Sequence, residues 1–443
     1  MPGNPQTKRY LSVFDSIAIV MGIVIGAGIF KTPSLVAASA GNEVTIIMVW
    51  LGGGIISLIG ALCYAELTST YPNIGGEYFY LNRAFGKAPS FLFAWARMAV
   101  IQTGSIAMMA FLIGDYASNI LNLGLYSSSY YAACTIVILT AINIAGVSQG
   151  SWIQKILIIS TISGLLFISF SGFFLASSDK ILSQISPSSA SGIGKAMVFV
   201  LLTYSGWNEA AYLSSEVRDP QRTMAKTLIY SIAIITAVYV MINIAFIEGL
   251  GIQAMSKSEL AATSLMENVF GGLGAKLTGL LVAIVALSTI NGIIITGART
   301  NYALGRDFKP FEFLGKWKEQ VGNPVNALIV QGIISIMLIG IGTGTRNGFV
   351  MMVEYTAPVF WLFFLLAGIS IFVLRKKEPS INRPFKVPLY PILPAVFCLI
   401  CMYMMYSSII YTGIGAVIGI AVLLTGLPIF FLKYLCSKTS KEV

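Results

Sequence analysis

The sequence predicts an all-α polytopic membrane protein with about twelve transmembrane helices. Three observations support this fold class. The 443 residues are 56% hydrophobic and only 10% charged, whereas about a quarter of the residues in a soluble domain are charged. The chain also divides into long apolar segments, each long enough to cross a bilayer. Lysine and arginine gather in alternate connections between these segments, which is typical of membrane topology. We therefore expect one transmembrane unit.

The apolar segments follow one another with short polar connections between them, and an even number of segments places both termini on one side of the membrane. The N-terminus has no short apolar region followed by a cleavage site, so no signal peptide is expected. The predicted segments are 12–38, 44–71, 89–115, 127–146, 152–176, 194–215, 225–249, 275–303, 325–342, 347–374, 388–410 and 412–433.

Basic residues orient this predicted bundle. Lys31 and Arg97 lie within segments. Of the other basic residues, one face carries only Lys180, Lys195, Lys257, Lys276 and Arg346, and the rest lie on the face that carries the termini. Cytoplasmic loops carry the excess of positive charge, so both termini are expected in the cytoplasm. The net charge of +10 is then a topology signal, and we expect no nucleic-acid partner.

The composition argues against an enzyme. Histidine, the commonest metal ligand, is absent, and no catalytic constellation is visible. Cys398 and Cys401 form a C-x-x-C pair inside a predicted spanning helix, where two small apolar fillers are expected rather than a redox or zinc pair. We expect no metal site and no cofactor, apart from coupling to Na⁺ or H⁺.

The first segment, 12–38, is interrupted near its middle by Gly26, Ala27 and Gly28, and Pro33 follows. Glycine weakens a helix and proline removes a backbone donor. Backbone groups freed at bilayer depth must face protein, water or a polar solute. The N-terminus of the outer half-helix would favour a carboxylate there. The alternative is a glycine pair that lets two helices pack closely.

The sixth segment, 194–215, repeats this theme. It becomes polar from Tyr204 to Glu209, with Ser205 and Gly206 in the middle. The two interrupted segments are five spans apart, so they run in opposite directions. Interrupted helices at matching positions of inverted halves indicate a secondary transporter with its site at the midplane.

With these motifs in hand, the chain resembles amino-acid permeases of the amino acid–polyamine–organocation superfamily, near the L-type amino-acid transporter branch. The resemblance implies alternating access and a five-plus-five inverted repeat over 12–176 and 194–374, with helices 1 and 6 unwound and two extra helices over 388–433. It covers almost the whole chain and is carried by Ile25-Gly-Ala-Gly-Ile-Phe30, Tyr64-Ala-Glu-Leu67, Gly75-Gly-Glu-Tyr78, Tyr204-Ser-Gly-Trp-Asn208, Glu216-Val-Arg-Asp-Pro220 and Ala298-Arg299.

The resemblance also implies roles for individual residues. Leu202 stands where many relatives carry a gating aromatic residue, and Trp207 is a second gate candidate, although aromatic residues in a bundle usually pack. Tyr239 matches a tyrosine that faces the substrate. The substrate carboxylate is expected to meet the N–H groups of Ala27, Gly28 and Ile29, and the amine to meet the carbonyls of Val24, Ile25, Leu202, Thr203 and Ser205.

Two departures from the family bear on coupling and substrate. Thr161 replaces a lysine found in several bacterial relatives, and Ser288, Thr289 and Asn291 are expected to surround the vacant cation position. They could bind sodium or hydrogen-bond with one another. Diamine and arginine antiporters carry an acid where Asn208 stands, which argues against a cationic substrate here, although Glu209 is adjacent.

Together these observations predict a secondary active transporter of neutral L-amino acids, working as an exchanger or a proton-linked carrier. The alternatives are a sodium-coupled symporter and a non-transporting sensor, although a sensor would be expected to carry a larger soluble extension. We expect the small amino-acid substrate and the lipid bilayer as partners, with no obligatory protein partner. The absence of an N-x-[ST] sequon is compatible with a bacterial inner membrane.

Three features near the predicted cytoplasmic boundary have simpler expectations. Glu66 lies late in the second segment and is expected to be hydrated. Arg97 lies near the start of the third and is expected to snorkel to the same side. The aromatic stretch 71–86 suits a short helix lying in the membrane interface.

Overall fold

The computed structural model describes residues 11–176, 190–258, 260–343, 348–411 and 414–439. Within these ranges the regular structure is helical, and extended pairing is limited to two isolated bridges. In the described part of the chain, ten helices are long and apolar enough to cross a membrane, and a bent pair brings the number to eleven. The all-α polytopic fold class is therefore confirmed.

The helices, in chain order, are α1 (Val13–Val24), α2 (Gly28–Ala40), α3 (Glu43–Thr70), α4 (Glu77–Phe85), α5 (Lys87–Ala96), the π-helical turn η1 (Arg97–Ile101), α6 (Gln102–Ile120), α7 (Ser127–Ala145), α8 (Val147–Phe174), α9 (Ala190–Tyr204), the 3₁₀ turn η2 (Trp207–Glu209), α10 (Ala210–Leu213), α11 (Pro220–Lys257), α12 (Ala261–Phe270), α13 (Gly272–Asp307), the 3₁₀ turn η3 (Lys309–Gly315), α14 (Val325–Thr343), α15 (Gly348–Lys377), α16 (Ile392–Tyr411) and α17 (Ile414–Thr439).

The difference between twelve predicted spans and eleven has a simple cause. The predicted first segment is α1 and α2, bent by 49° at their break. The predicted sixth segment is α9, which has only 15 residues before the chain turns into η2 and α10. Neither piece reaches spanning length by itself, because the break falls inside the segment.

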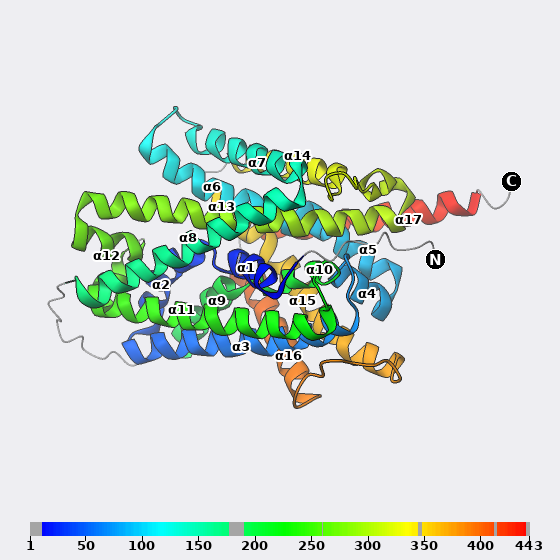
Figure 1. The fold of residues 1–443 in the computed structure, drawn as a ribbon, viewed down its shortest axis with the longest axis horizontal. Coiled ribbons are helices and arrows are strands. Elements are labelled where there is room, and N and C mark those ends of the chain that lie inside the picture. The colour runs from blue at the N-terminus through cyan, green and yellow to red at the C-terminus, as the bar shows by residue number, and fades with distance from the viewer. Residues whose placement is uncertain (1–10, 177–189, 259, 344–347, 412–413, 440–443) are drawn as a thin grey trace.

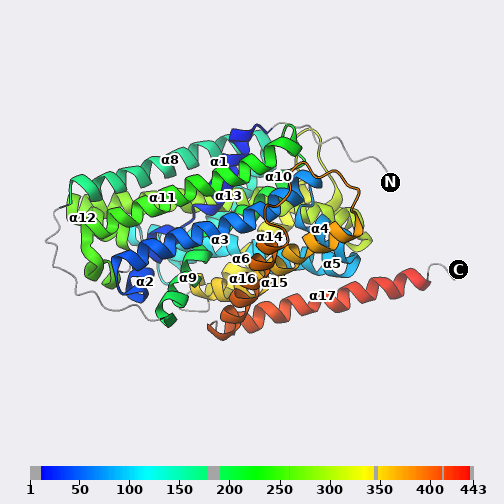
Figure 2. The same ribbon diagram turned by 90° about the horizontal axis from the view of Figure 1, so that it is seen from below.

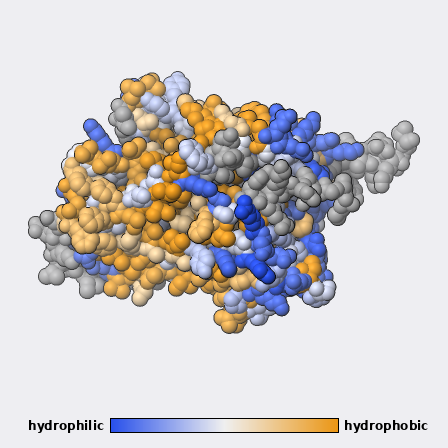
Figure 3. Space-filling view, viewed as in Figure 1, coloured by the Kyte–Doolittle hydropathy of each residue, from blue (hydrophilic) through white to orange (hydrophobic). Residues whose placement is uncertain are grey.

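The long helices run roughly parallel, with α1 among α8, α11 and α13 (Figures 1 and 2). One end of the bundle carries α4, α5, α10 and the end of α17, and we call it the α4 end. The opposite end carries α2 and α12. On the face shown in Figure 3, hydrophobic residues cover most of the surface and hydrophilic residues gather toward the α4 end. This distribution suits a protein whose sides face lipid.

The stretch 71–86 does form a short helix, α4, but it does not lie at the surface as expected. Glu77, Tyr78, Tyr80, Leu81 and Ala84 are buried. The helix packs into the α4 end because its buried face carries polar side chains with partners on other helices. Two of the basic residues used to predict the orientation, Lys180 and Arg346, lie outside the described residues.

Candidate functional site

The first break separates α1 from α2. α1 ends at Val24, the N–H of Gly26 donates to the carbonyl of Val24 at 2.8 Å, and α2 starts at Gly28. The N–H groups of Ile29 and Phe30 turn back to the carbonyls of Gly26 and Ala27, at 3.4 and 3.1 Å. The N-terminal end of α2, with its partial positive charge, therefore faces the break.

The second break follows Tyr204, the last residue of α9. Gly206 has a φ of 111°, which side chains with a Cβ rarely adopt. A Cβ there would also lie 3.0 Å from Cγ2 of Ile23, in α1. Glycine is thus required twice, once for the backbone angle and once for the approach of the two interrupted helices.

Tyr239, from α11, joins the two breaks. Its hydroxyl donates to the carbonyl of Val24 at 2.9 Å and to the carbonyl of Thr203 at 3.3 Å, and the residue is fully buried. Tyr239 thus lies between the two breaks, and the substrate contact implied by the resemblance stays a prediction. Val24 already accepts bonds from Tyr239 and Gly26, so a bound amine would compete for its carbonyl.

Gly28 and Thr203, predicted from separate motifs, lie against each other. A Cβ on Gly28 would be 2.9 Å from Oγ1 of Thr203, and Thr203 Oγ1 donates to Oγ1 of Thr32 at 2.8 Å. The structure thus brings the predicted carboxylate end of the first break next to the predicted amine end of the second. Ile25, Ala27 and Ile29 are buried at the same break.

Leu202 lies in the last turn of α9, and Ser205 is the first residue of the second break. The hydroxyl of Ser205 donates to the carbonyl of Leu202 at 2.7 Å. The side chain of Leu202 is 38% exposed, so it has room for a larger side chain. Its gating role stays a prediction.

Trp207 packs in an aromatic layer. Its ring stacks on Phe364 with centroids 5.3 Å apart and meets the edge of Tyr64 at 5.1 Å. A Cβ on Gly60 would lie 2.6 Å from this indole. Packing is therefore its visible role, and gating stays a prediction. A small cavity beside it is lined by Ile56, Ser57, Leu201, Ser205, Trp207, Trp361, Phe364, Phe397 and Ile400.

A neutral polar cluster lies beneath the first break, and we call it the amide cluster. Gln154 of α8 donates to Ser288 of α13 at 2.9 Å and accepts from Asn291 at 2.9 Å, and Asn143 of α7 donates to Asn291 at 2.8 Å. All four are buried. Sequence reasoning placed Ser288 and Asn291 here but missed the two amide partners on α7 and α8.

The amide cluster contacts α1 at Gly22, one turn before the break. A Cβ at Gly22 would lie 2.0 Å from Nε2 of Gln154. The carbonyl of Gly22 accepts from Thr289 at 3.2 Å and from Ser288 at 3.5 Å. Thr161 lies two turns along α8 from Gln154 and is fully buried, and its Oγ1 has no partner among the described residues.

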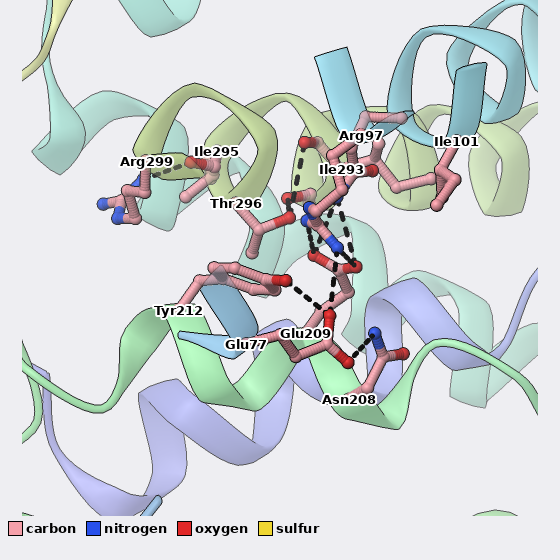
Figure 4. A network of polar contacts seen from close by, with 12 residues as sticks. Glu77, Arg97, Ile101, Asn208, Glu209, Tyr212, Ile293, Ile295, Thr296 and Arg299 are labelled. Atoms are coloured by element: carbon pink, nitrogen blue, oxygen red, sulfur yellow. Dashed lines mark hydrogen bonds and ion pairs between the residues drawn. The ribbon is translucent and has the colours of Figure 1, made fainter. Parts of the chain in front are cut away.

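A charged cluster supports the second break, and we call it the carboxylate cluster (Figure 4). Arg97 of η1 makes two bonds of 2.9 Å to Glu209 of η2, and Gln102 adds bonds of 3.1 and 3.0 Å to the same carboxylate. Glu77 of α4 accepts from Tyr212 at 2.5 Å, from Asn208 at 3.3 Å and from Tyr64.

Arg97 also lies over the ring of Tyr212, 3.9 Å from its centroid. The snorkelling expectation for Arg97 is wrong, because the side chain is 1% exposed and paired inside the bundle. It is placed there by a π-helical turn, a distortion often found at functional sites.

The hydrated position expected for Glu66 is also wrong. Glu66 is buried and accepts from Arg375 at 2.5 and 2.8 Å and from the N–H of Val387 at 2.7 Å. Glu216 and Arg299, quoted above only as family motifs, form a further buried pair at 2.5 and 2.8 Å. Burial of a charge without a partner is costly, so the position of Glu66 and Arg299 in apolar segments was the available signal.

The chain was compared with known proteins. The family model "Amino acid permease" matches residues 11–431. The chain is 28% identical to the b(0,+)-type amino acid transporter 1 of Mus musculus, over 91% of this chain and 83% of that protein. It is 25% identical to the serine/threonine exchanger SteT of Bacillus subtilis (strain 168), over 96% of each.

It is also 28% identical to the cystine/glutamate transporter of Homo sapiens, over 98% of this chain and 87% of that protein. These relatives are transporters rather than enzymes. The chain therefore belongs to the amino acid permease family and is an integral membrane transporter of amino acids.

Proposed function

We propose that this protein exchanges neutral L-amino acids across a bacterial cytoplasmic membrane, with the α4 end toward the cytoplasm. The substrate's carboxylate would bind the N–H groups of Ala27, Gly28 and Ile29. Its amine would bind backbone carbonyls of the two breaks, with Tyr239 between them. These groups recognise the part that all amino acids share, so the size and charge of the side chain are selected elsewhere.

One observation supports a substrate with a neutral side chain. Glu209 is the acid nearest the second break, and both of its oxygens are bonded to Arg97 and Gln102. Asn208, at the position where antiporters of cationic substrates carry an acid, turns its amide toward Glu77 at 3.3 Å. A cationic side chain would have to compete with a buried guanidinium for Glu209. A neutral side chain needs no such partner.

The amide cluster supports exchange over sodium coupling. The hydroxyls of Ser288 and Thr289 are both bonded to the carbonyl of Gly22, and Gln154 bonds to Ser288 and Asn291. A sodium ion would have to displace these contacts. Sodium-coupled symport is the second candidate, and it is favoured by the unpartnered buried hydroxyl of Thr161.

Uptake into proteoliposomes tests the proposal. Labelled serine, alanine or leucine should enter quickly only when the vesicles are preloaded with unlabelled neutral amino acid, and arginine should neither enter nor accelerate exit. Uptake should not change when sodium is replaced by potassium, in the wild type or in Thr161→Lys. Steep sodium dependence in the wild type that is lost in Thr161→Lys would instead establish the symporter.

Two further expectations stay with this proposal. The protein is expected to work without an obligatory protein partner, which co-purification from its native membrane would test. The second expectation is the inverted repeat over 12–176 and 194–374, with two added helices over 388–433. In such inverted repeats the substrate site lies near the midplane of the membrane.

A further inference from the structure

Three sets of buried acids paired with arginines lie toward the α4 end, and one of them is short of positive charge. Glu216 pairs with Arg299, one acid with one arginine. Glu66 has two arginines, Arg375 and Arg383, at 2.5 and 3.5 Å. The carboxylate cluster has two acids, Glu77 and Glu209, and among the described residues Arg97 is the one cation paired with them.

Arg97 is shared unequally between the two acids. Both of its short bonds go to Glu209, and its nearest approach to Glu77 is 3.7 Å. Glu77 is therefore held by neutral donors, the hydroxyls of Tyr64 and Tyr212 and the amide of Asn208. A buried carboxylate without a close cation is costly when it is ionised, and a proton removes that cost.

The side chain of Asn208 can accept a hydrogen bond from a protonated Glu77. Its Nδ2 donates to Glu77 at 3.3 Å, while its buried Oδ1 has no partner among the described residues. Rotating the amide exchanges these two atoms, since an amide carries a donor and an acceptor at its two ends. Oδ1 would then accept a hydrogen bond from the protonated carboxyl of Glu77.

We propose that Glu77 is a proton-binding site of the gate at the α4 end, occupied by a proton while this end is closed and vacated when it opens. Glu77 of α4 joins Tyr64 of α3 to Asn208 and Tyr212 of the interrupted sixth helix. Opening this end moves the sixth helix away and lets water reach the carboxyl. The inference rests on the proposed alternating access and deepens it.

The direction of the pH effect follows from linkage. Burial raises the pKa of Glu77 in the closed form, against lowering by Arg97 and the hydroxyls of Tyr212 and Tyr64, and Glu209 raises it further. In an open, hydrated form the pKa returns toward its ordinary value of 4.5. The closed form therefore binds more protons, and acid favours closure. Each unit of difference in pKa changes the closed-to-open ratio by up to about tenfold.

Other charged groups near α4 have partners of their own. On α15, Glu378 binds Arg83 and Tyr71, Arg375 binds Glu66, and Lys377 donates to the carbonyl of Ala84. The titratable and charged groups that act on Glu77 are Tyr64 from α3, Tyr80 from α4, Arg97 from η1, Glu209 from η2 and Tyr212 from α10.

Thermal unfolding of the intact protein in detergent tests proton binding without any need for transport. Glu77→Gln keeps the shape and removes the charge. Because the pKa of Glu77 is higher in the folded than in the unfolded protein, stability is lost as the pH rises above the ordinary value of 4.5. The wild type should therefore lose unfolding temperature relative to Glu77→Gln as the pH is raised from pH 4 to pH 8. A difference between the two proteins that stays constant over this range would overturn the proposal.

Exchange in proteoliposomes tests the gate. Wild-type exchange should slow by about tenfold as the pH on both sides falls through the titration of Glu77, because protons hold the α4 end closed. Glu77→Gln should be slow and independent of pH. Glu378→Gln, an acid of the same end outside the cluster, should keep the wild-type profile. A wild-type profile in Glu77→Gln would contradict the gate.

Tyr212→Phe covers the case in which Glu77→Gln does not fold. It removes one donor to the charged form of Glu77 and keeps the ring beneath Arg97, so the midpoint should move to higher pH. An unchanged midpoint would count against Glu77. If no amino acid is exchanged but the stability difference still depends on pH, the proposed function fails and the proton site stands.

Discussion

The two breaks of this transporter are supported by different chemistry. Beneath the first break lies the amide cluster, built from neutral amides and a hydroxyl around Gln154. Beneath the second lies the carboxylate cluster, with two acids sharing one arginine. Both are buried, and both join several helices, so the difference lies in charge rather than in position.

This difference has consequences for movement. Neutral hydrogen bonds contribute about 0.5–1.5 kcal/mol each and do not change with pH near neutrality. Charged groups in a low dielectric interact more strongly, and they are costly when left without a partner. We therefore expect the first break to be held in the same way at every pH, and the second to depend on how many protons its cluster carries.

The largest effect should come from removing the shared arginine. Arg97→Met leaves Glu77 and Glu209 buried without a cation, and loss of one partner of a buried ion pair costs about 3–5 kcal/mol. Chemical unfolding of the purified protein would measure this loss. Adding Glu209→Gln to Arg97→Met should recover part of it, and no recovery would mean that Arg97 acts by packing.

Next comes the first break itself. Gly28→Val would place a branched side chain where a Cβ alone approaches Oγ1 of Thr203 within 2.9 Å, in the expected path of the substrate carboxylate. Binding of serine or leucine, measured by calorimetry, should fall by more than about a hundredfold, or about 2.7 kcal/mol. Retained affinity in a folded Gly28→Val protein would place the carboxylate elsewhere.

Gln154→Leu tests the neutral cluster. Ser288 and Asn291 would each lose a bond to the amide, which should cost about 1–3 kcal/mol of stability. Because amides and hydroxyls do not titrate in this range, the loss should be the same at pH 5 and pH 8, and unfolding at the two values measures this. A loss that depends on pH would remove the distinction between the two clusters.

The smallest effect is expected at the end of α9. Leu202 is 38% exposed, so Leu202→Phe should fit with a change in stability below about 1 kcal/mol. If Leu202 faces the substrate, the preference among alanine, serine, leucine and phenylalanine should shift toward smaller side chains. Competition assays would show this shift, and unchanged preferences would place residue 202 away from the pathway.

Local sequence determined the spans and the breaks. Apolar length fixes a spanning helix because the bilayer offers no partner for backbone groups. The first helix opens at the glycines, between Val24 and Gly28, while Pro33 lies inside α2. The left-handed angle of Gly206 explains why the second opens there. Gly28 was expected at the first break from the sequence itself, Thr203 was expected only from the family resemblance, and their contact comes from the packing of α2 on α9. The inverted direction of the two segments followed from counting spans.

Only the tertiary structure decided which polar residues meet. From the sequence, Glu66 and Arg97 were expected at the hydrated boundary of the membrane. A single helix offers neither charge a partner, and a charge without a partner is most stable in water. Folding supplies partners from distant segments, with Arg375 for Glu66 and Glu209 for Arg97. Gln154 was missed for the same reason, since its partners lie 134 and 137 residues away. Such pairings depend on helix packing, which no local pattern encodes.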